Sequence, residues 1–250
     1  MQLELIRNAT LKITYAGHVL LIDPYFAPRH SLPSFTGRSP NPMTELPRST
    51  DEILGGVELV IVSHLHTDHF DAVAKERVTK SLPILCQPGD EGSIRDAGFI
   101  DVTPLADTTV WNGITITPRQ GSHGLGPVIE KMGRVIGLTL AAPGEPTVYW
   151  AGDTVLYRPV IETIRQVSPD IIVTHSCGAK WDGDLIVMDA EQTVEVTRLA
   201  PEAIVVATHM EALDHATITR QDLRQTADAT GVDPSRLLIP ADGETLRLDK

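Results

Sequence analysis

The stretch that decides the fold is Val57-Glu58-Leu59-Val60-Ile61-Val62-Ser63-His64-Leu65-His66-Thr67-Asp68-His69. Its first part is an almost continuous run of apolar, β-branched residues, which predicts a strand buried on both faces of a sheet. Its second part, from His64 to His69, holds three of the nine histidines of the chain, together with one aspartate. Imidazole and carboxylate groups clustered at a strand end predict a site for cations such as zinc, iron or manganese.

Periodicity on both sides of this segment predicts an alternation of strands and helices. In the first half, strands are expected near residues 3–7, 11–15, 19–22 and 83–86, with a helix over 72–78. In the second half, strands are expected near residues 114–117, 135–140, 147–151, 171–174 and 203–207, with helices over 161–167, 190–199 and 220–230. Two successive groups of strands, each followed by helices, predict one α/β domain over residues 1–250, with two sheets face to face and helices outside.

Polar motifs stand directly after three of these strands, at Ser63-His64, Gly152-Asp153 and Thr208-His209. Ligand sites of α/β proteins commonly form at the carboxyl ends of strands, so we expect the three motifs to meet at one site. His64 and His66 point to the same side of an extended backbone. The following Asp68 and His69 can reach a second position as the chain turns, so the segment could serve two neighbouring cations.

The composition is that of an ordinary globular protein, with 42% hydrophobic and 22% charged residues in a chain of 250. The formal net charge of −12 argues against a nucleic-acid partner, which needs clustered Lys and Arg, and favours a small-molecule substrate. The first residues lack the pattern of an export signal, and no apolar run approaches the roughly 20 residues that cross a bilayer. We expect a cytoplasmic protein with no transmembrane segment, and leave a homo-oligomer open. Cys86 and Cys177 form no CxxC pair and are expected to be buried structural residues.

A long stretch from Phe26 to Thr50 is rich in Pro, Ser, Arg and Asn and shows no periodicity. Loops of this length usually have a function. Arg29, His30 and Arg38 lie within it and could recognise an anionic group of a substrate at the entrance of the site. The alternative is that they are solvated loop residues.

The histidine cluster and three later motifs resemble those of a known family. The segment His64 to His69 is similar to the HxHxDH signature of the metallo-β-lactamase superfamily. The later motifs resemble, in order, the isolated third histidine, the bridging aspartate and the final histidine of that family: Gly121-Ser122-His123-Gly124, Trp150-Ala151-Gly152-Asp153-Thr154 and Ala207-Thr208-His209-Met210. The resemblance spans nearly the whole chain.

Within the superfamily, the chain most resembles the branch that contains ascorbate-6-phosphate lactonase and N-acyl-phosphatidylethanolamine-hydrolysing phospholipase D. The shared cues are Leu21-Ile22-Asp23-Pro24, Val187-Met188-Asp189-Ala190 and the Met-Glu pair after His209. Members of this branch act on different small molecules, so the resemblance does not identify a substrate.

The resemblance implies a four-layered αββα sandwich with two divalent metal ions at the edge of the sheets. It assigns three side chains to each metal and one to both: His64, His66 and His123 to the first, Asp68, His69 and His209 to the second, and Asp153 as the bridge. Zn²⁺ is the expected metal, with Mn²⁺ or Fe²⁺ as alternatives.

Two cations at this separation can hold a bridging water and lower its pKa towards about 7. We therefore expect a metal-dependent hydrolase that uses a metal-bridging hydroxide to cleave a small-molecule ester-type bond, in a lactone or a phosphodiester. Asp68 is expected to orient the attacking group or to accept its proton. The alternatives are an iron-dependent redox enzyme on the same scaffold and a metal-binding module without catalysis.

Three further residues have two interpretations each. His175 follows the strand 171–174 and could act in the same cleft or form a hydrogen bond at the strand end. His215 lies six residues after His209 and could donate to a substrate or leaving group, or be an ordinary loop histidine. Asp23 is expected to orient a ligand rather than to bind a metal itself.

Overall fold

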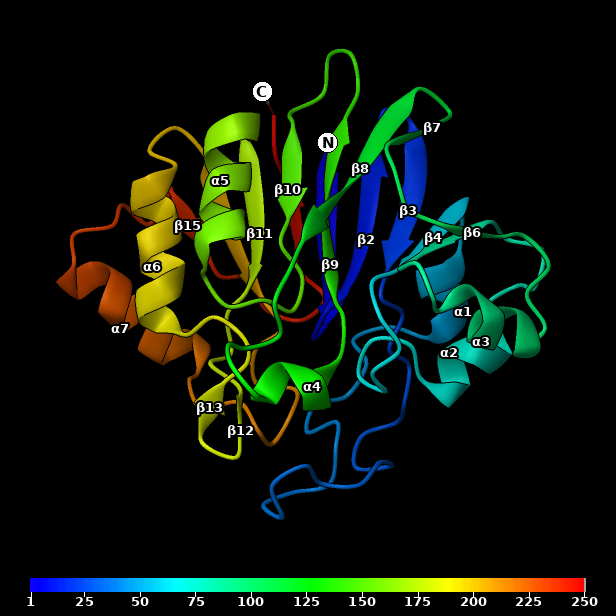
Figure 1. The fold of residues 1–250 in the computed structure, drawn as a ribbon, viewed down its shortest axis with the longest axis horizontal. Coiled ribbons are helices and arrows are strands. Elements are labelled where there is room, and N and C mark those ends of the chain that lie inside the picture. The colour runs from blue at the N-terminus through cyan, green and yellow to red at the C-terminus, as the bar shows by residue number, and fades with distance from the viewer. Residues whose placement is uncertain (250) are drawn as a thin grey trace.

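Two seven-stranded sheets pack face to face and helices cover their outer faces, which confirms the predicted αββα sandwich (Figure 1). The computed structural model describes residues 1–249. A hydrogen bond joins Leu248 to Met1 at one end of the sandwich, and the long loop after β3 (His18–Ile22) extends from the opposite end.

The first sheet has the strand order β16-β1-β2-β3-β4-β5-β6. Besides β3, its strands are β1 (Gln2–Arg7), β2 (Thr10–Tyr15), β4 (Leu59–Val62), β5 (Ile84–Cys86), β6 (Val102–Pro104) and β16 (Thr245–Arg247). The helices on its outer face are α1 (Thr50–Leu54), α2 (Ala72–Arg77) and α3 (Glu91–Asp96). From β3 to β6 the strands run parallel, so their carboxyl ends share one edge, and His64 lies at this edge.

The second sheet has the strand order β15-β14-β11-β10-β9-β8-β7. Its strands are β7 (Thr109–Trp111), β8 (Ile114–Gln120), β9 (Ile136–Ala141), β10 (Val148–Trp150), β11 (Ile171–His175), β14 (Ile204–Thr208) and β15 (Leu237–Leu238). The helices packed on its outer face are α5 (Arg158–Val167), α6 (Ala190–Leu199) and α7 (Arg220–Ala229). Helix α4 (Val128–Met132) and the hairpin of β12 (Lys180–Trp181) and β13 (Asp184–Leu185) lie at the same end of the sandwich as the long loop.

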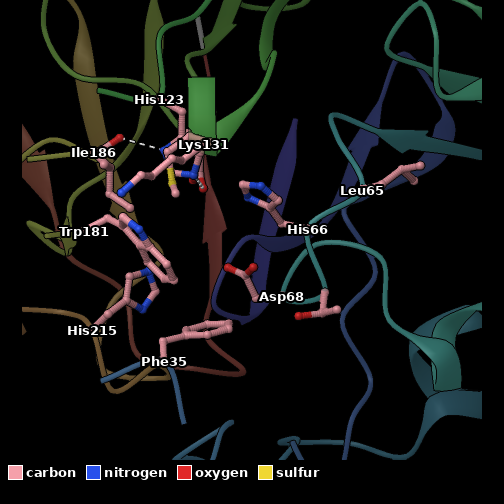
Figure 2. A pocket seen from close by; sticks show the side chains of 12 residues that line it. Phe35, Leu65, His66, Asp68, His123, Lys131, Trp181, Ile186 and His215 are labelled. Carbon is pink, nitrogen blue, oxygen red and sulfur yellow. Dashed lines mark hydrogen bonds and ion pairs between the residues drawn. The ribbon is translucent and has the colours of Figure 1, made fainter. Parts of the chain in front are cut away.

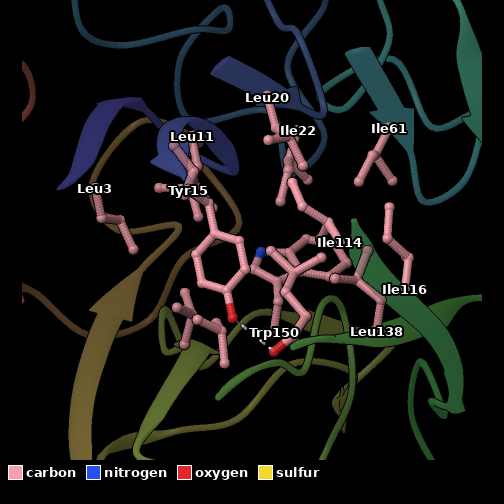
Figure 3. Close-up of a cluster of buried hydrophobic side chains, with 14 of the residues drawn as sticks. Leu3, Leu11, Tyr15, Leu20, Ile22, Ile61, Ile114, Ile116, Leu138 and Trp150 are labelled. Carbon is pink, nitrogen blue, oxygen red and sulfur yellow. Dashed lines mark hydrogen bonds between the residues drawn. The ribbon is translucent and has the colours of Figure 1, made fainter. Parts of the chain in front are cut away.

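Alternating side chains of the strands fill the space between the sheets. On β4, Leu59 and Ile61 belong to the core between the sheets, whereas Val60 and Val62 pack against the helices outside. Strand β4 is therefore buried on both faces, as its apolar run predicted. Trp150 of β10 is among the largest side chains in the central core (Figure 3).

The short strands β6, β7, β15 and β16 were not predicted, and one predicted strand is longer than expected. Strand β11 includes His175, whereas the predicted strand stops at Thr174, so His175 takes part in the sheet and is fully buried. The C-terminal strand β16 pairs with β1, and no local pattern predicts a contact between the two ends of a chain. By contrast, the predicted loop from Phe26 onward contains only an isolated bridge between Leu32 and Asn41.

Both cysteines are buried and free, which confirms the prediction for Cys86 and Cys177. Among residues 1–249, no helix is both long enough and apolar enough to cross a membrane.

The hydroxyl of Tyr15 links β2 to the second sheet, because it donates to the carbonyl of Pro146, in the loop before β10, at 2.8 Å and lies 3.3 Å from the carbonyl of Leu140 in β9. Figure 3 shows Tyr15 in this buried interior beside Trp150. Tyr15→Phe leaves the Pro146 carbonyl without this donor, and we expect the free energy of unfolding to fall by about 1–2 kcal/mol in urea titrations. The matched control is Tyr25→Phe, because the buried Tyr25 hydroxyl has no hydrogen-bond partner within residues 1–249. Equal destabilisation by the two substitutions would contradict the linking role of Tyr15.

Candidate metal centre

The seven predicted ligands come together at one end of the sandwich. Each follows the end of a strand: four come from the segment after β4, and one each comes from the segments after β8, β10 and β14. These side chains are His64, His66, Asp68, His69, His123, Asp153 and His209. All are buried except His66, which is half-buried. The separate motifs therefore lie together at one site, as expected.

The carboxylate of Asp153 lies in the middle of the cluster. Its Oδ2 atom is 3.1 Å from His69 Nε2, 3.3 Å from His123 Nε2 and 3.9 Å from His64 Nε2. Its Oδ1 atom is 3.6 Å from His209 Nε2. One carboxylate therefore faces histidines of both predicted ligand groups, which is the geometry that a bridging ligand needs.

The chain reaches Asp153 through a turn that depends on Gly152. This glycine has a φ of 70°, in the left-handed region that side chains other than glycine rarely adopt. A Cβ atom there would also come within 2.9 Å of the Ile136 carbonyl and of the Trp150 ring. The sharp exit from β10 therefore requires glycine directly before the bridging aspartate.

The donor atoms form two groups within which all lie within 4.8 Å of one another. The first group is His64, His66, His123 and Asp153, as the resemblance implied. The second is His69, Asp153, His175 and His209, so that His175 stands where Asp68 was expected. Asp68 remains beside this second group, because its Oδ2 atom is 3.2 Å from His209 Nε2.

Hydrogen bonds at Nδ1 turn the Nε2 atoms of the histidines towards the centre. His69 Nδ1 lies 2.7 Å from Asp23 Oδ2, and His123 Nδ1 donates to the Ile186 carbonyl at 2.8 Å. Asp23 also accepts hydrogen bonds from the amide and the hydroxyl of Ser63, and the same hydroxyl lies 2.9 Å from His64 Nδ1. Such partners fix the tautomer and the direction of metal-binding imidazoles. Asp23 thus occupies the orienting position predicted for it.

The cluster favours positive charge at its centre. Burial on its own raises the pKa of Asp153, but three neighbouring imidazoles outweigh this effect and hold the pKa well below its usual range. Burial lowers the pKa of His69, yet three neighbouring carboxylates raise it to about 10. Divalent cations satisfy the same demand for positive charge.

His175 forms the kind of hydrogen bond that was one of its two predicted interpretations, whereas the contact of Asn8 with the cluster was not predicted. His175 Nδ1 lies 2.6 Å from Asp153 Oδ1, on the sheet side of the carboxylate, and His175 does not line the main cavity. Asn8 reaches in from the turn between β1 and β2, where its amide nitrogen donates to the carbonyl of Asp68 at 3.1 Å and lies 3.5 Å from Asp68 Oδ2. In the sequence, Asn8 is recognisable only as a turn residue between two strands.

A cavity of about 620 Å³ opens on the exposed side of the centre. His66, Asp68, His123 and Asp153 form its floor, and His215 lies in its wall. The remaining wall is largely apolar and comes from the long loop, α4, the hairpin segment and Leu65 of the His64–His69 segment. Its apolar members are Phe35, Leu65, Met132, Trp181 and Ile186. Figure 2 shows Phe35 and His215 next to each other, with Asp68 and His66 facing them. Sequence periodicity did not identify these apolar residues, because they lie in irregular segments or in elements of two to five residues, which are too short to show a period.

Other residues singled out in the sequence lie away from this cavity. Arg38 donates to the carbonyl of Ala216 and lines a separate hollow, and His30 and Arg29 do not line the main cavity. Glu211 forms an ion pair with Arg220. The possible anion contacts from the long loop are therefore not part of the cavity at the metal centre.

A family model described as "Beta-lactamase superfamily domain" matches residues 18–210. The chain belongs to the metallo-β-lactamase superfamily. Within the superfamily it is 38% identical, over 98% of its length and 99% of the relative's, to the UPF0173 protein YddR of Bacillus subtilis. Its family is thus that of the UPF0173 metal-dependent hydrolases, the name that further relatives bear.

Two solved structures resemble this superfamily member along their whole length. One is a possible metal-dependent hydrolase from Veillonella parvula, with 36% identity, a TM-score of 0.95 and 99% of both chains covered. The other is an isothiocyanate hydrolase from Delia radicum gut bacteria, with 35% identity, a TM-score of 0.95 and 100% of both chains covered.

The two donor groups predict how metal content responds to substitution. We expect Asp153→Asn to lose both metal ions, because it removes the charge shared by the two groups, and His66→Ala to lose one. The matched control is His215→Ala, which lines the same cavity outside the donor groups and should keep both ions. Elemental analysis of the dialysed proteins by mass spectrometry measures the difference. If His215→Ala loses metal as His66→Ala does, the assignment of the ligands is wrong.

Proposed function

We propose that the chain is a dinuclear metal-dependent hydrolase that acts on small, uncharged and partly apolar molecules with an electrophilic carbon. The observation that carries the proposal is the combination of two buried donor groups around Asp153 with a cavity whose remaining wall is largely apolar. The donor groups define the chemistry, and the apolar cavity wall limits which substrates can bind.

The donor groups suit zinc, manganese or iron, because they consist of imidazole nitrogens and carboxylate oxygens. The Nε2 atom of His64 is buried and has no hydrogen-bond partner within residues 1–249, as expected of an atom reserved for a metal. We assign His64, His66 and His123 to one ion, and Asp68, His69 and His209 to the other, with Asp153 shared and Zn²⁺ as the first choice. Two such ions would lower the pKa of a water between them and polarise the atom under attack.

Asp68 and His215 are the residues of the chain that we place beside the reacting atoms. Asp68 lines the cavity and is held by Asn8, so it can orient the attacking water and accept its proton. Burial lowers the pKa of His215 to about 4, so its imidazole is neutral near pH 7 and can donate to or accept from a substrate without adding charge. His175 contacts the Asp153 carboxylate on the side away from the cavity, so it acts through that carboxylate and not on the substrate.

The cavity favours an uncharged substrate over an anionic one. Within residues 1–249, Lys131 is the one Lys or Arg that lines it, and its ammonium group is 2.6 Å from Asp182 Oδ2. A phosphodiester could place its charge on the metal ions that the donor groups would hold, but beyond them it would meet apolar side chains and a lysine that is already paired with Asp182. A lactone carbonyl and the central carbon of an isothiocyanate are both neutral electrophiles.

Likeness to the isothiocyanate hydrolase supports the second of these substrates. Water adds to the central carbon of R–N=C=S, the nitrogen takes up the protons and the C–N bond breaks, so that one water yields R–NH₂ and carbonyl sulfide. The same attacking group and the same apolar wall would serve a lactone, which is our second candidate.

A substrate panel tests the proposal. Zinc-loaded protein should release amine from aryl and alkyl isothiocyanates, or open lactones, at rates well above those with a phosphodiester of similar size. Asp68→Asn, once its metal content is verified, should lower kcat by about 100-fold or more. Preferential cleavage of the phosphodiester would overturn the substrate assignment, and unchanged turnover in metal-loaded Asp68→Asn would remove Asp68 from the mechanism.

A further inference from the structure

The side chain of Asp214, the residue before the cavity residue His215, is buried, and its hydrogen bonds all go to the long loop. Its carboxylate accepts hydrogen bonds from the amides of Phe35 and Thr36 at 2.9 and 3.0 Å, and from the Thr36 hydroxyl at 2.6 Å. It also accepts from the Ser34 hydroxyl and, at 2.9 Å, from the side-chain amide of Asn41. Hydrogen bonds to a charged acceptor are stronger than those between neutral groups.

These contacts fix the part of the loop that carries Phe35. Backbone hydrogen bonds join His30 to Pro42 and Leu32 to Asn41, but within residues 1–249 no backbone–backbone hydrogen bond involves residues 33–40, so the tip of the loop depends on its contacts with Asp214. Burial on its own raises the pKa of Asp214, but the hydrogen bonds outweigh it and hold the pKa well below its usual range. The hydrogen bonds thus favour the ionised form of the carboxylate.

The fixed loop presents the Phe35 ring to the cavity. The ring meets that of His215, the residue after Asp214, edge to face at a centroid distance of 5.0 Å (Figure 2). The Phe35 side chain is 36% exposed, so neighbouring side chains enclose it only in part. The hydrogen bonds from Asp214 place its main chain, and the contact with His215 places its ring.

We propose that Asp214 is a positioning residue for substrate specificity: it holds Phe35 as one wall of the cavity, and this wall selects substrates with an apolar, preferably aromatic, substituent. The proposal rests on the proposed function in one respect, namely that this cavity receives the substrate. It does not require that the metals be bound or that a particular bond be cleaved.

A double-mutant cycle on ligand binding tests the proposal without turnover. The probe is benzyl alcohol, a neutral aromatic molecule, whose affinity for wild type, Asp214→Asn, Phe35→Ala and the double variant is measured by ligand-observed NMR. We expect each single substitution to weaken binding about fivefold, which is the scale of one aromatic contact. The double variant should bind no more weakly than Phe35→Ala, because Asp214 acts through Phe35.

A matched pair in the same loop controls for general damage. Ser34→Ala removes a donor to Asp214, whereas Ser31→Ala removes a hydroxyl that donates to the Pro28 carbonyl at 2.7 Å instead. Ser34→Ala should weaken binding in part and Ser31→Ala should not. If Asp214→Asn fails to fold, Ser34→Ala replaces it in the cycle.

Two results would overturn the proposal: wild-type protein that does not bind benzyl alcohol, or a substitution at Asp214 that weakens binding equally with and without Phe35. If only the proposed function is wrong, the protein should bind benzyl alcohol with the expected differences among the variants but hydrolyse none of the substrates. If the protein hydrolyses both an aryl and an alkyl isothiocyanate, Asp214→Asn should raise KM about fivefold for the aryl compound and leave kcat unchanged.

Discussion

The buried carboxylate of Asp153 is the constraint on which the site depends. Burial of an unpaired carboxylate is costly, and this one is tolerated because histidine nitrogens surround both of its oxygens. Those histidines come from β4, β8, β11 and β14 or from the segments after them, so the two sheets must pack in one relative position for the cluster to form. The core between the sheets, with Trp150 two residues before Gly152, maintains that position.

The site has a rigid half and an irregular half. Strand ends and their hydrogen-bonding partners, such as Asp23 with Ser63 and His69, hold the donor atoms in place. The opposite half comes from the long loop, α4 and the β12–β13 hairpin, and it supplies the apolar wall. Chemistry and substrate choice are therefore carried by different parts of the chain, and the second can change without disturbing the first.

The sequence predicted the sandwich and the gathering of the motif residues because both depend on local patterns. Apolar runs identify the strands, and His64 to His69 is a dense cluster of metal-binding side chains directly after one of them. Asn8, Phe35 and Asp214 were not identified, because each acts through contacts between segments far apart in the chain, and none belongs to a periodic pattern. The predicted strand ended at Thr174, one residue before the end of β11. That single residue decides whether the side chain of His175 belongs to the sheet or to the cleft.

The most direct test of the central role of Asp153 is an anomalous diffraction map of crystals of the metal-loaded protein. Two peaks about 3.5–4 Å apart, one on each side of the Asp153 carboxylate, are the expected result. A single peak, or peaks that the Asp153 carboxylate does not contact, would contradict a centre built around this residue.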